Sequence, residues 1–308
     1  MSASAVRFSP VSVELQSLIA LKPAGETIRL TAPRIRALAI GGHLSPFKGR
    51  GVEFDESRPY QAGDDLRTID WRVTARTGKP YTKVFREERN RPVIVWLDLR
   101  RSMLFATRGA YKAVVAAELA ALIGWSAVGN GDQLGGLVFS DVEHHELRPR
   151  LGRRAALRLV QTICGSPCWR EASPEGPGGG DTDHALLRLT RVARPGSMLF
   201  LISDFRGLTD ASERHIRQLA SHDDLFLVHV FDPIEAELPP PGRYRIQLGG
   251  RSFAIETSDA ALRARYRAQF ESRRARIEAL GRLPGVSLMQ CATHENPHEV
   301  LSKRFGRA

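Results

Sequence analysis

Short, uninterrupted apolar segments that alternate with helical patterns constrain this chain more than any other feature. Val93–Leu97 and Met198–Ser203 contain no charged side chain, and Leu225–Phe231 is almost as apolar. Such segments are typical of strands covered on both faces, because a half-exposed strand alternates polar and apolar residues. Their alternation with helices predicts an α/β fold with a doubly wound, mostly parallel sheet.

The rest of the chain fits the same scheme. Further strands are predicted at 134–139, 143–147 and 286–290, with a hairpin flanking Gly249-Gly250. Helices are predicted at 11–21, 111–123, 153–164, 183–193, 212–220, 259–280 and 297–303. We therefore expect three parts: an N-terminal accessory region (1–90), an α/β domain (91–235), and a C-terminal extension (236–308) packed on it.

Composition restricts the classes of protein. Of the 308 residues, 42% are hydrophobic and 26% charged, which is typical of a folded globular chain. No apolar run approaches the roughly 18 residues of a membrane span, and the three cysteines are too few for a disulfide framework. These features predict a cytoplasmic protein. The net charge of +11 favours acidic partners, but the arginines are spread along the chain, and nucleic-acid binders gather them on one face.

Two of the predicted strands lead directly into an aspartate, Asp98 and Asp204. Ligands of open α/β sheets bind outside the carboxyl ends of the strands, where loops distant in sequence converge. With Ser102 and Thr182, the two aspartates supply two carboxylates and two hydroxyls, which are oxygen ligands suited to Mg²⁺. The alternative for Ser102 and Thr182 is a structural one, since hydroxyls at such positions cap helices.

This arrangement resembles the von Willebrand factor A domain with its metal-ion-dependent adhesion site, whose first element is Asp-x-Ser-x-Ser. The segment before it is similar to the signature of the domain of unknown function 58 family. The matching residues are Glu53-Phe54, Arg58-x-Tyr60, Gly63-Asp64-Asp65, Arg67-x-Ile69-Asp70-Trp71 and Ala75-Arg76. The resemblance implies a von Willebrand factor A-like domain and, as a partner, a MoxR-type AAA+ ATPase.

The first element departs from the family pattern, because Arg100 stands where the first serine is expected. One hypothesis is that Arg100 pairs with Asp98 or Asp204 and replaces the metal. The other is that Arg100 points outward, and Ser102, Thr182 and Asp204 still hold Mg²⁺. In the first case the upper surface offers Arg100 and Arg101 to an acidic partner residue.

We therefore expect a non-enzymatic adaptor that acts with the ATPase in the assembly or maturation of another complex. Its expected partner-binding residues are Asp98, Arg100, Arg101, Ser102, Thr182 and Asp204. The alternatives are a metal-dependent hydrolase that uses Asp98 and Asp204 to activate water, and a basic nucleic-acid-binding protein.

The signature itself is rich in Asp and Arg. The alternatives for this segment are a ligand-binding cluster and an ion-pair network that pins the accessory region to the core, and the network is favoured. The residues concerned are Asp64, Asp65, Arg67, Asp70, Arg72 and Arg76. We expect Tyr60 and Trp71 to pack beneath this network.

Overall fold

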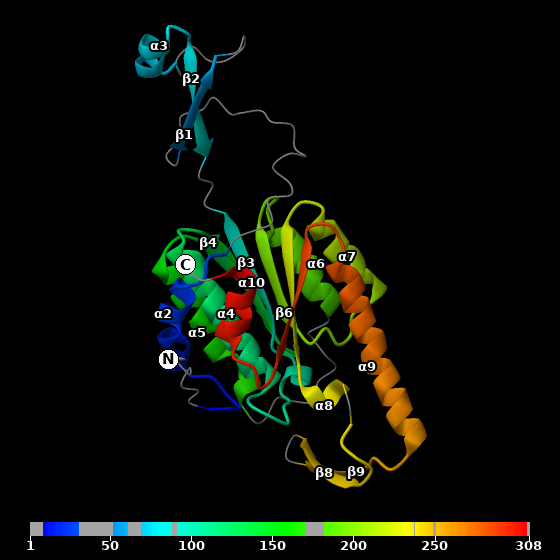
Figure 1. The fold of residues 1–308 in the computed structure, drawn as a ribbon. Coiled ribbons are helices and arrows are strands. Elements are labelled where there is room, and N and C mark those ends of the chain that lie inside the picture. The colour runs from blue at the N-terminus through cyan, green and yellow to red at the C-terminus, as the bar shows by residue number, and fades with distance from the viewer. Residues whose placement is uncertain are drawn as a thin grey trace. The chain divides into compact units, whose positions relative to one another are not determined.

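The fold was analysed in a computed structural model of the chain (Figure 1). It describes residues 9–30, 52–60, 69–87, 91–170, 182–236, 238–248 and 251–306. The described residues divide into two compact units, one formed by residues 1–33 and 91–308 and the other by residues 34–90.

The larger unit is built on a six-stranded sheet with the strand order β10-β7-β6-β3-β4-β5. Its strands are β3 (Pro92–Asp98), β4 (Gln133–Phe139), β5 (His144–Arg150), β6 (Met198–Ser203), β7 (Asp224–Phe231) and β10 (Val286–Ala292). All neighbouring strands pair in parallel except β4 and β5. The predicted α/β fold with a mostly parallel, doubly wound sheet is confirmed.

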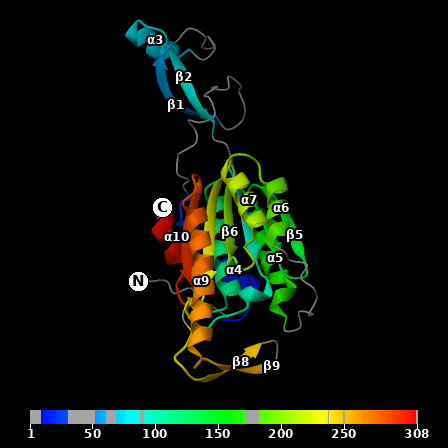
Figure 2. The same ribbon diagram turned by 90° about the vertical axis from the view of Figure 1, so that its right-hand side faces the viewer.

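Helices cover both faces of this sheet, as Figures 1 and 2 show. One face carries α1 (Leu15–Ala20), α2 (Lys22–Glu26), α4 (Lys112–Gly129), α5 (Arg153–Gly165) and α10 (Pro297–Phe305). The other carries α6 (Thr182–Val192), α7 (Asp210–Ala220) and α9 (Ala260–Gly281). Short helical turns η2 (Arg101–Met103), η3 (Pro167–Trp169) and α8 (Pro233–Ala236) lie in the connections.

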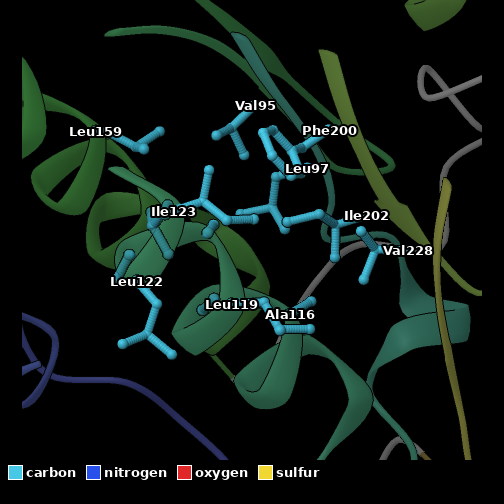
Figure 3. Packing of buried hydrophobic residues seen from close by; sticks show 14 of the residues in the cluster. Val95, Leu97, Ala116, Leu119, Leu122, Ile123, Leu159, Phe200, Ile202 and Val228 are labelled. Carbon is cyan, nitrogen blue, oxygen red and sulfur yellow. The ribbon is translucent and has the colours of Figure 1, made fainter. Parts of the chain in front are cut away.

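The strands divide their side chains between two hydrophobic cores. Val95 and Leu97 of β3 pack toward α4, whereas Ile94 and Trp96 pack toward α6 and α7. This follows from the two-residue repeat of a strand, which sends successive side chains to opposite faces. Figure 3 shows the α4 side of the sheet, where Leu119 packs among side chains of β3, β6 and β7.

Helix α4 is buried on all sides. Sixteen of its residues are buried, because the sheet lies on one side and α1, α2, α5 and α10 lie on the others. The helix is also long and apolar enough, by length and composition, to cross a membrane. Lys112 and Glu118 interrupt its apolar residues, and 89% of the helix is buried inside the protein. The absence of a membrane span therefore stays a prediction.

The N-terminal segment packs tightly on α4. A Cβ atom on Gly25 would lie 2.7 Å from the Trp125 Cβ, so only glycine permits this approach of α2. The Trp125 indole donates to the carbonyl of Leu18 at 2.9 Å, and Ser126 Oγ donates to that of Ile28 at 2.6 Å. These bonds join α1 and α2 to the core of the larger unit, although the sequence assigned them to the accessory region.

The C-terminal part also contributes to the core of the larger unit. β10 extends the sheet beside β7, and Phe305 of α10 contacts the rings of Phe200 and Phe226. The hairpin of β8 (Arg243–Leu248) and β9 (Arg251–Glu256) lies between α8 and α9 in sequence. The sheet thus continues beyond residue 235, where the sequence placed the end of the α/β domain.

The smaller unit contains β1 (Val52–Pro59), α3 (Trp71–Thr77) and β2 (Tyr81–Glu87), with β1 and β2 antiparallel. Asp70 caps α3 by accepting from the amides of Arg72 and Val73, and it also accepts from the Ser57 hydroxyl. Helix α3 then ends on Gly78 in the left-handed conformation.

Only part of the predicted Asp/Arg network can be followed. Asp64, Asp65 and Arg67 lie outside the described residues. Trp71 is 70% exposed on the first turn of α3, so the prediction that it packs beneath the network was wrong. Asp70 accepts from Ser57 of β1, whereas the Trp71 ring that follows it is left open to solvent.

We expect the two tryptophans to differ sharply in their contribution to stability. Trp71→Ala should change the free energy of unfolding by less than about 0.5 kcal/mol, because the ring is exposed. Trp125→Ala should cost about 3–5 kcal/mol, since it leaves a cavity and an unpaired carbonyl at Leu18. Urea unfolding followed by far-ultraviolet circular dichroism measures both, and equal losses would contradict this assignment.

Candidate functional site

A row of polar side chains crosses three neighbouring strands near their carboxyl ends. Leu97 pairs with Ile202, so Asp98 stands beside Ser203, and Ser203 pairs in turn with His229. Ser203 Oγ donates to Asp98 Oδ2 at 2.7 Å and accepts from the backbone amide of Phe205. Register therefore places Asp98 inside a buried polar row on the α6 and α7 side of the sheet.

The Asp98 carboxylate is fully buried and is held by the guanidinium of Arg100. Arg100 Nε lies 2.9 Å from Asp98 Oδ1, and Arg100 Nη2 lies 2.6 Å from Oδ2. Nη2 also donates to the carbonyl of Arg206, and the guanidinium lies over the Phe139 ring. Burial opposes the charge on Arg100, but the hydrogen bonds to Asp98 raise the pKa of its guanidinium, so Arg100 stays charged.

Asp204 is equally buried and is bonded by three other residues. Its Oδ1 accepts from the Ser102 hydroxyl at 3.4 Å and from the Arg206 amide at 3.0 Å. Its Oδ2 accepts from Lys112 Nζ at 2.7 Å. Burial alone would raise the pKa of Asp204, but the charge of Lys112 lowers it, so Asp204 is a carboxylate.

Lys112 joins this site to α8. Its Nζ donates to Glu235 Oε1 at 2.7 Å, and Arg206 Nη2 donates to the same oxygen at 2.6 Å. Lys112 is fully buried and Glu235 is 2% exposed. Arg100, Lys112 and Arg206 thus neutralise three buried carboxylates, and we name these six residues the charge network: Asp98, Asp204, Glu235, Arg100, Lys112 and Arg206.

Sequence reasoning found two of the carboxylates but missed Lys112, Ser203, Arg206 and Glu235. One signal for Lys112 was present, because a lysine in the first turn opposes the helix dipole, and here it opens an apolar helix. Glu235 gave no signal, since it lies in a four-residue helix after β7.

The remaining predicted residues lie around the charge network. Thr182 opens α6 and is buried, and its hydroxyl has no hydrogen-bond partner among the described residues. Thr182 Oγ1 and Arg100 Nη1 both lie against Gly207. The Arg101 amide donates to Asp141 Oδ2 at 2.6 Å, while the Arg101 side chain is exposed. Asp141, which follows β4, is a third acid after a strand that sequence reasoning overlooked.

The outer surface of the site is cationic. The Arg206 side chain is 41% exposed, whereas that of Arg100 is only 13% exposed. Half-buried Arg273 of α9 lies near Arg206, and its pKa is lowered first by burial and then by the charge of Arg206. Among the described residues no carboxylate forms an ion pair with Arg273, so an incoming anion would be favoured there.

A family model described as "Protein of unknown function DUF58" matches residues 56–276. The chain belongs to the DUF58 family. This DUF58 protein is 31% identical over 277 residues to the uncharacterized protein Rv1480 of Mycobacterium tuberculosis and to the uncharacterized protein Mb1516 of Mycobacterium bovis. Each alignment covers 89% of this chain and 85% of the relative.

Solved structures with a similar fold include an aerotolerance-related membrane protein from Bacteroides fragilis, BatB from Bacteroides thetaiotaomicron and the SpRpn10 VWA domain. Their TM-scores are 0.43, 0.41 and 0.38, at 14%, 15% and 9% identity. They match 70%, 69% and 70% of this chain over 96%, 96% and 94% of their own lengths. The DUF58 chain has an α/β fold with a six-stranded, mostly parallel sheet.

The residues of the DUF58 site do not fit the divalent ion that the resemblance to the von Willebrand factor A domain implies. Mg²⁺ needs about six oxygen ligands at roughly 2.0–2.1 Å, and an adjacent fixed cation repels it. Arg100 bonds both oxygens of Asp98, and Lys112 bonds Asp204. Of the two arrangements considered for Arg100, the structure has the inward one. Within the described ranges, no group of three or more His, Cys, Asp or Glu residues is disposed to hold a metal.

Removal of Lys112 should be far more costly than loss of a surface lysine. Lys112→Met keeps the apolar stem but leaves Asp204 and Glu235 buried without this cation, which should cost about 3–5 kcal/mol. Lys22→Met, which removes an exposed i,i+4 pair with Glu26, should cost no more than about 0.5 kcal/mol. Denaturant unfolding of the two variants measures the difference, and similar losses would contradict the proposed charge balance.

His229 should make the protein sensitive to mild acid. Burial lowers its pKa to about 4, whereas the unfolded chain titrates near 6.5. Between pH 4 and 6.5 the histidine is protonated in the unfolded chain but not in the folded one. The contribution of His229 to the free energy of unfolding is therefore fully present above pH 6.5 and is lost as the pH falls toward 4. Its size is on the order of 3 kcal/mol.

Asp132 and Asp223 act in the opposite direction, because burial raises the pKa of each to about 6. Their protonation stabilises the folded state as the pH falls below 6, so the dependence of wild-type stability on pH does not by itself report on His229. The stability difference between wild type and His229→Leu isolates the histidine. We expect His229→Leu to become more stable relative to the wild type as the pH falls from 6.5 to 4. A difference in the free energy of unfolding that does not depend on pH would contradict the assignment.

Proposed function

We propose that this DUF58 protein is a non-enzymatic interaction module. In the proposal it acts in the cytoplasm with a MoxR-type AAA+ ATPase during the assembly or maturation of another complex. The observation that carries the proposal is the bidentate Arg100–Asp98 pair, a fixed cation within a von Willebrand factor A-type site. The ATPase enters from the family resemblance.

The chemistry of recognition follows from the charge network. In a metal-containing adhesion site, the ion attracts a carboxylate from the partner. Here guanidinium groups offer positive charge at the same edge of the sheet, and guanidinium binds carboxylate through two hydrogen bonds. Arg100 lies too deep for this contact, so the proposed receiving groups are Arg101, Arg206 and Arg273.

A metal-dependent hydrolase is less well supported by the same contacts. Activation of water by a carboxylate needs a free lone pair directed at the water or at a bound metal. Asp98 accepts from Arg100 and Ser203, and Asp204 accepts from Lys112, Ser102 and the amide of the Arg206 turn. These partners occupy the carboxylate oxygens that would have to face the water, which favours the interaction module over the hydrolase.

The proposal is tested by measuring association of the purified chain with a MoxR-type ATPase of the same organism. Biolayer interferometry with ATP, with ADP and without nucleotide covers the states of the ATPase. Arg101→Glu combined with Arg273→Glu reverses two surface charges and leaves the charge network intact. We expect this variant to bind at least about tenfold more weakly, because it loses charge-assisted contacts.

The matched control is Arg191→Glu combined with Arg214→Glu, two exposed residues of α6 and α7. It changes the net charge equally and should bind like the wild type. Absence of association in every nucleotide state, or equal weakening by the control, would contradict the proposal. Tight calorimetric binding of Mg²⁺ to the wild type that disappears in Asp204→Ala would contradict its metal-free form.

A further inference from the structure

A second candidate surface lies at the opposite end of the sheet. A cavity of about 300 Å³ opens between the start of β4, the end of β5 and α5. Leu134, which lines this cavity, pairs with Val93 of β3, and Asp98 lies five residues further along that strand. At the rise of a parallel strand, the two levels are roughly 16 Å apart.

The inside of the cavity is apolar. Leu134, Leu147, Leu151 and Leu159 line it, together with Ala155. Leu151 is 53% exposed, which makes it one of the large apolar side chains that the described residues leave open to solvent. Aliphatic walls of this kind receive an aliphatic or aromatic side chain, because the apolar surface of both groups leaves water.

The rim of the cavity is strongly basic. Arg148 and Arg150 of β5 and Arg154 and Arg158 of α5 are exposed and line it. None of the four has an ion pair with a described carboxylate. Residues 147–165 contain five arginines and no acidic residue. A concentration of one sign of charge around a low-dielectric hollow attracts and orients anions.

Two backbone features add to this positive field. Helix α5 has thirteen residues and begins at Arg153, after Gly152, which provides no side-chain cap, and it carries no acid in its first turn. Its amino end therefore keeps its partial positive charge beside Arg154. Strand β5 is the last strand in the sheet order, and Figure 2 shows it at the sheet edge beside α5. The cavity is thus open at the margin of the domain.

From these observations we infer that the cavity binds an acidic peptide segment of a protein partner. In this mode an apolar side chain of the segment enters the leucine-lined hollow, and neighbouring carboxylates pair with the rim arginines. A nucleic acid fits less well, because its phosphates would use the rim but nothing in it would fill an aliphatic hollow. The cavity lining also contains no aromatic side chain on which a base would stack.

This surface is independent of the charge network. It uses residues of β4, β5 and α5, and none of the six network residues lines it. The acidic segment can therefore bind here whether or not the ATPase binds at the other end of the sheet.

Fluorescence anisotropy with a labelled peptide, Glu-Asp-Glu-Leu-Leu-Glu-Asp-Glu, tests the inference on the full chain. The wild type should bind it saturably at low salt. A matched peptide with Ser-Ser in place of Leu-Leu reports on the apolar contact, and a single-stranded oligothymidylate of equal charge reports on simple phosphate attraction. We expect the leucine peptide to bind more tightly than either probe.

Arg154→Glu combined with Arg158→Glu should weaken peptide binding at least about tenfold, as expected when charge-assisted hydrogen bonds are lost. Arg191→Glu combined with Arg214→Glu, with the same change in net charge, should leave the affinity within about twofold of the wild type. Thermal unfolding of both variants checks that they fold.

Three outcomes would overturn the inference. These are no saturable binding by the wild type at millimolar peptide, equal loss in the two double variants, and tighter binding of the oligothymidylate than of the leucine peptide. The last result would assign the surface to nucleic acid. An affinity that changes neither in Leu151→Ser nor with the Ser-Ser peptide would contradict the inferred entry of an apolar side chain into the hollow.

Discussion

Three carboxylates pair with three basic side chains at the carboxyl end of the sheet, and these pairs determine its geometry. Asp98, Asp204 and Glu235 are at most 2% exposed, and Arg100, Lys112 and Arg206 pair with them. A buried charge without its partner costs several kcal/mol, so the segments that carry these groups must meet in one arrangement. Such pairs contribute little net stability, because the loss of hydration offsets most of their attraction, and their main effect is on geometry.

That geometry explains why this site differs from the metal-binding site that the family resemblance implies. A divalent ion is bound where carboxylate oxygens face a common point without cations beside them. In this chain Arg100 and Lys112 bond those oxygens from within, and the positive charge that remains accessible belongs to side chains at the surface, Arg206 and Arg273. The proposed attraction for an acidic partner therefore needs no bound metal.

The two proposed surfaces share a preference for anions but differ in how they select them. The charge network presents fixed guanidinium groups with little apolar surface, which favours a single well-placed carboxylate. The arginine-rimmed cavity combines charge with a leucine-lined hollow, which favours an acidic segment that also carries an apolar side chain. Their positions at opposite ends of one sheet suit a protein that holds two partners at once.

The sequence by itself determined the family, the strands and the general location of the site. Apolar runs such as Val93–Leu97 identify buried strands, and the rule for strand ends places Asp98 and Asp204 at one edge of the sheet. These features are local or follow from a general rule of topology. The position of Ser102 near these acids could be expected for the same reason, whereas the sequence left open whether Arg100 pairs with an acid or points outward.

Only the tertiary structure decided which groups complete the site. Lys112 reaches Asp204 and Glu235 because α4 begins beside the ends of β6 and β7, and Ser203 meets Asp98 through strand register. The packing of α2 on Trp125 and the exposure of Trp71 depend in the same way on contacts between distant segments. No local pattern encodes them, because each arises from the position of one element against another and not from the period of either.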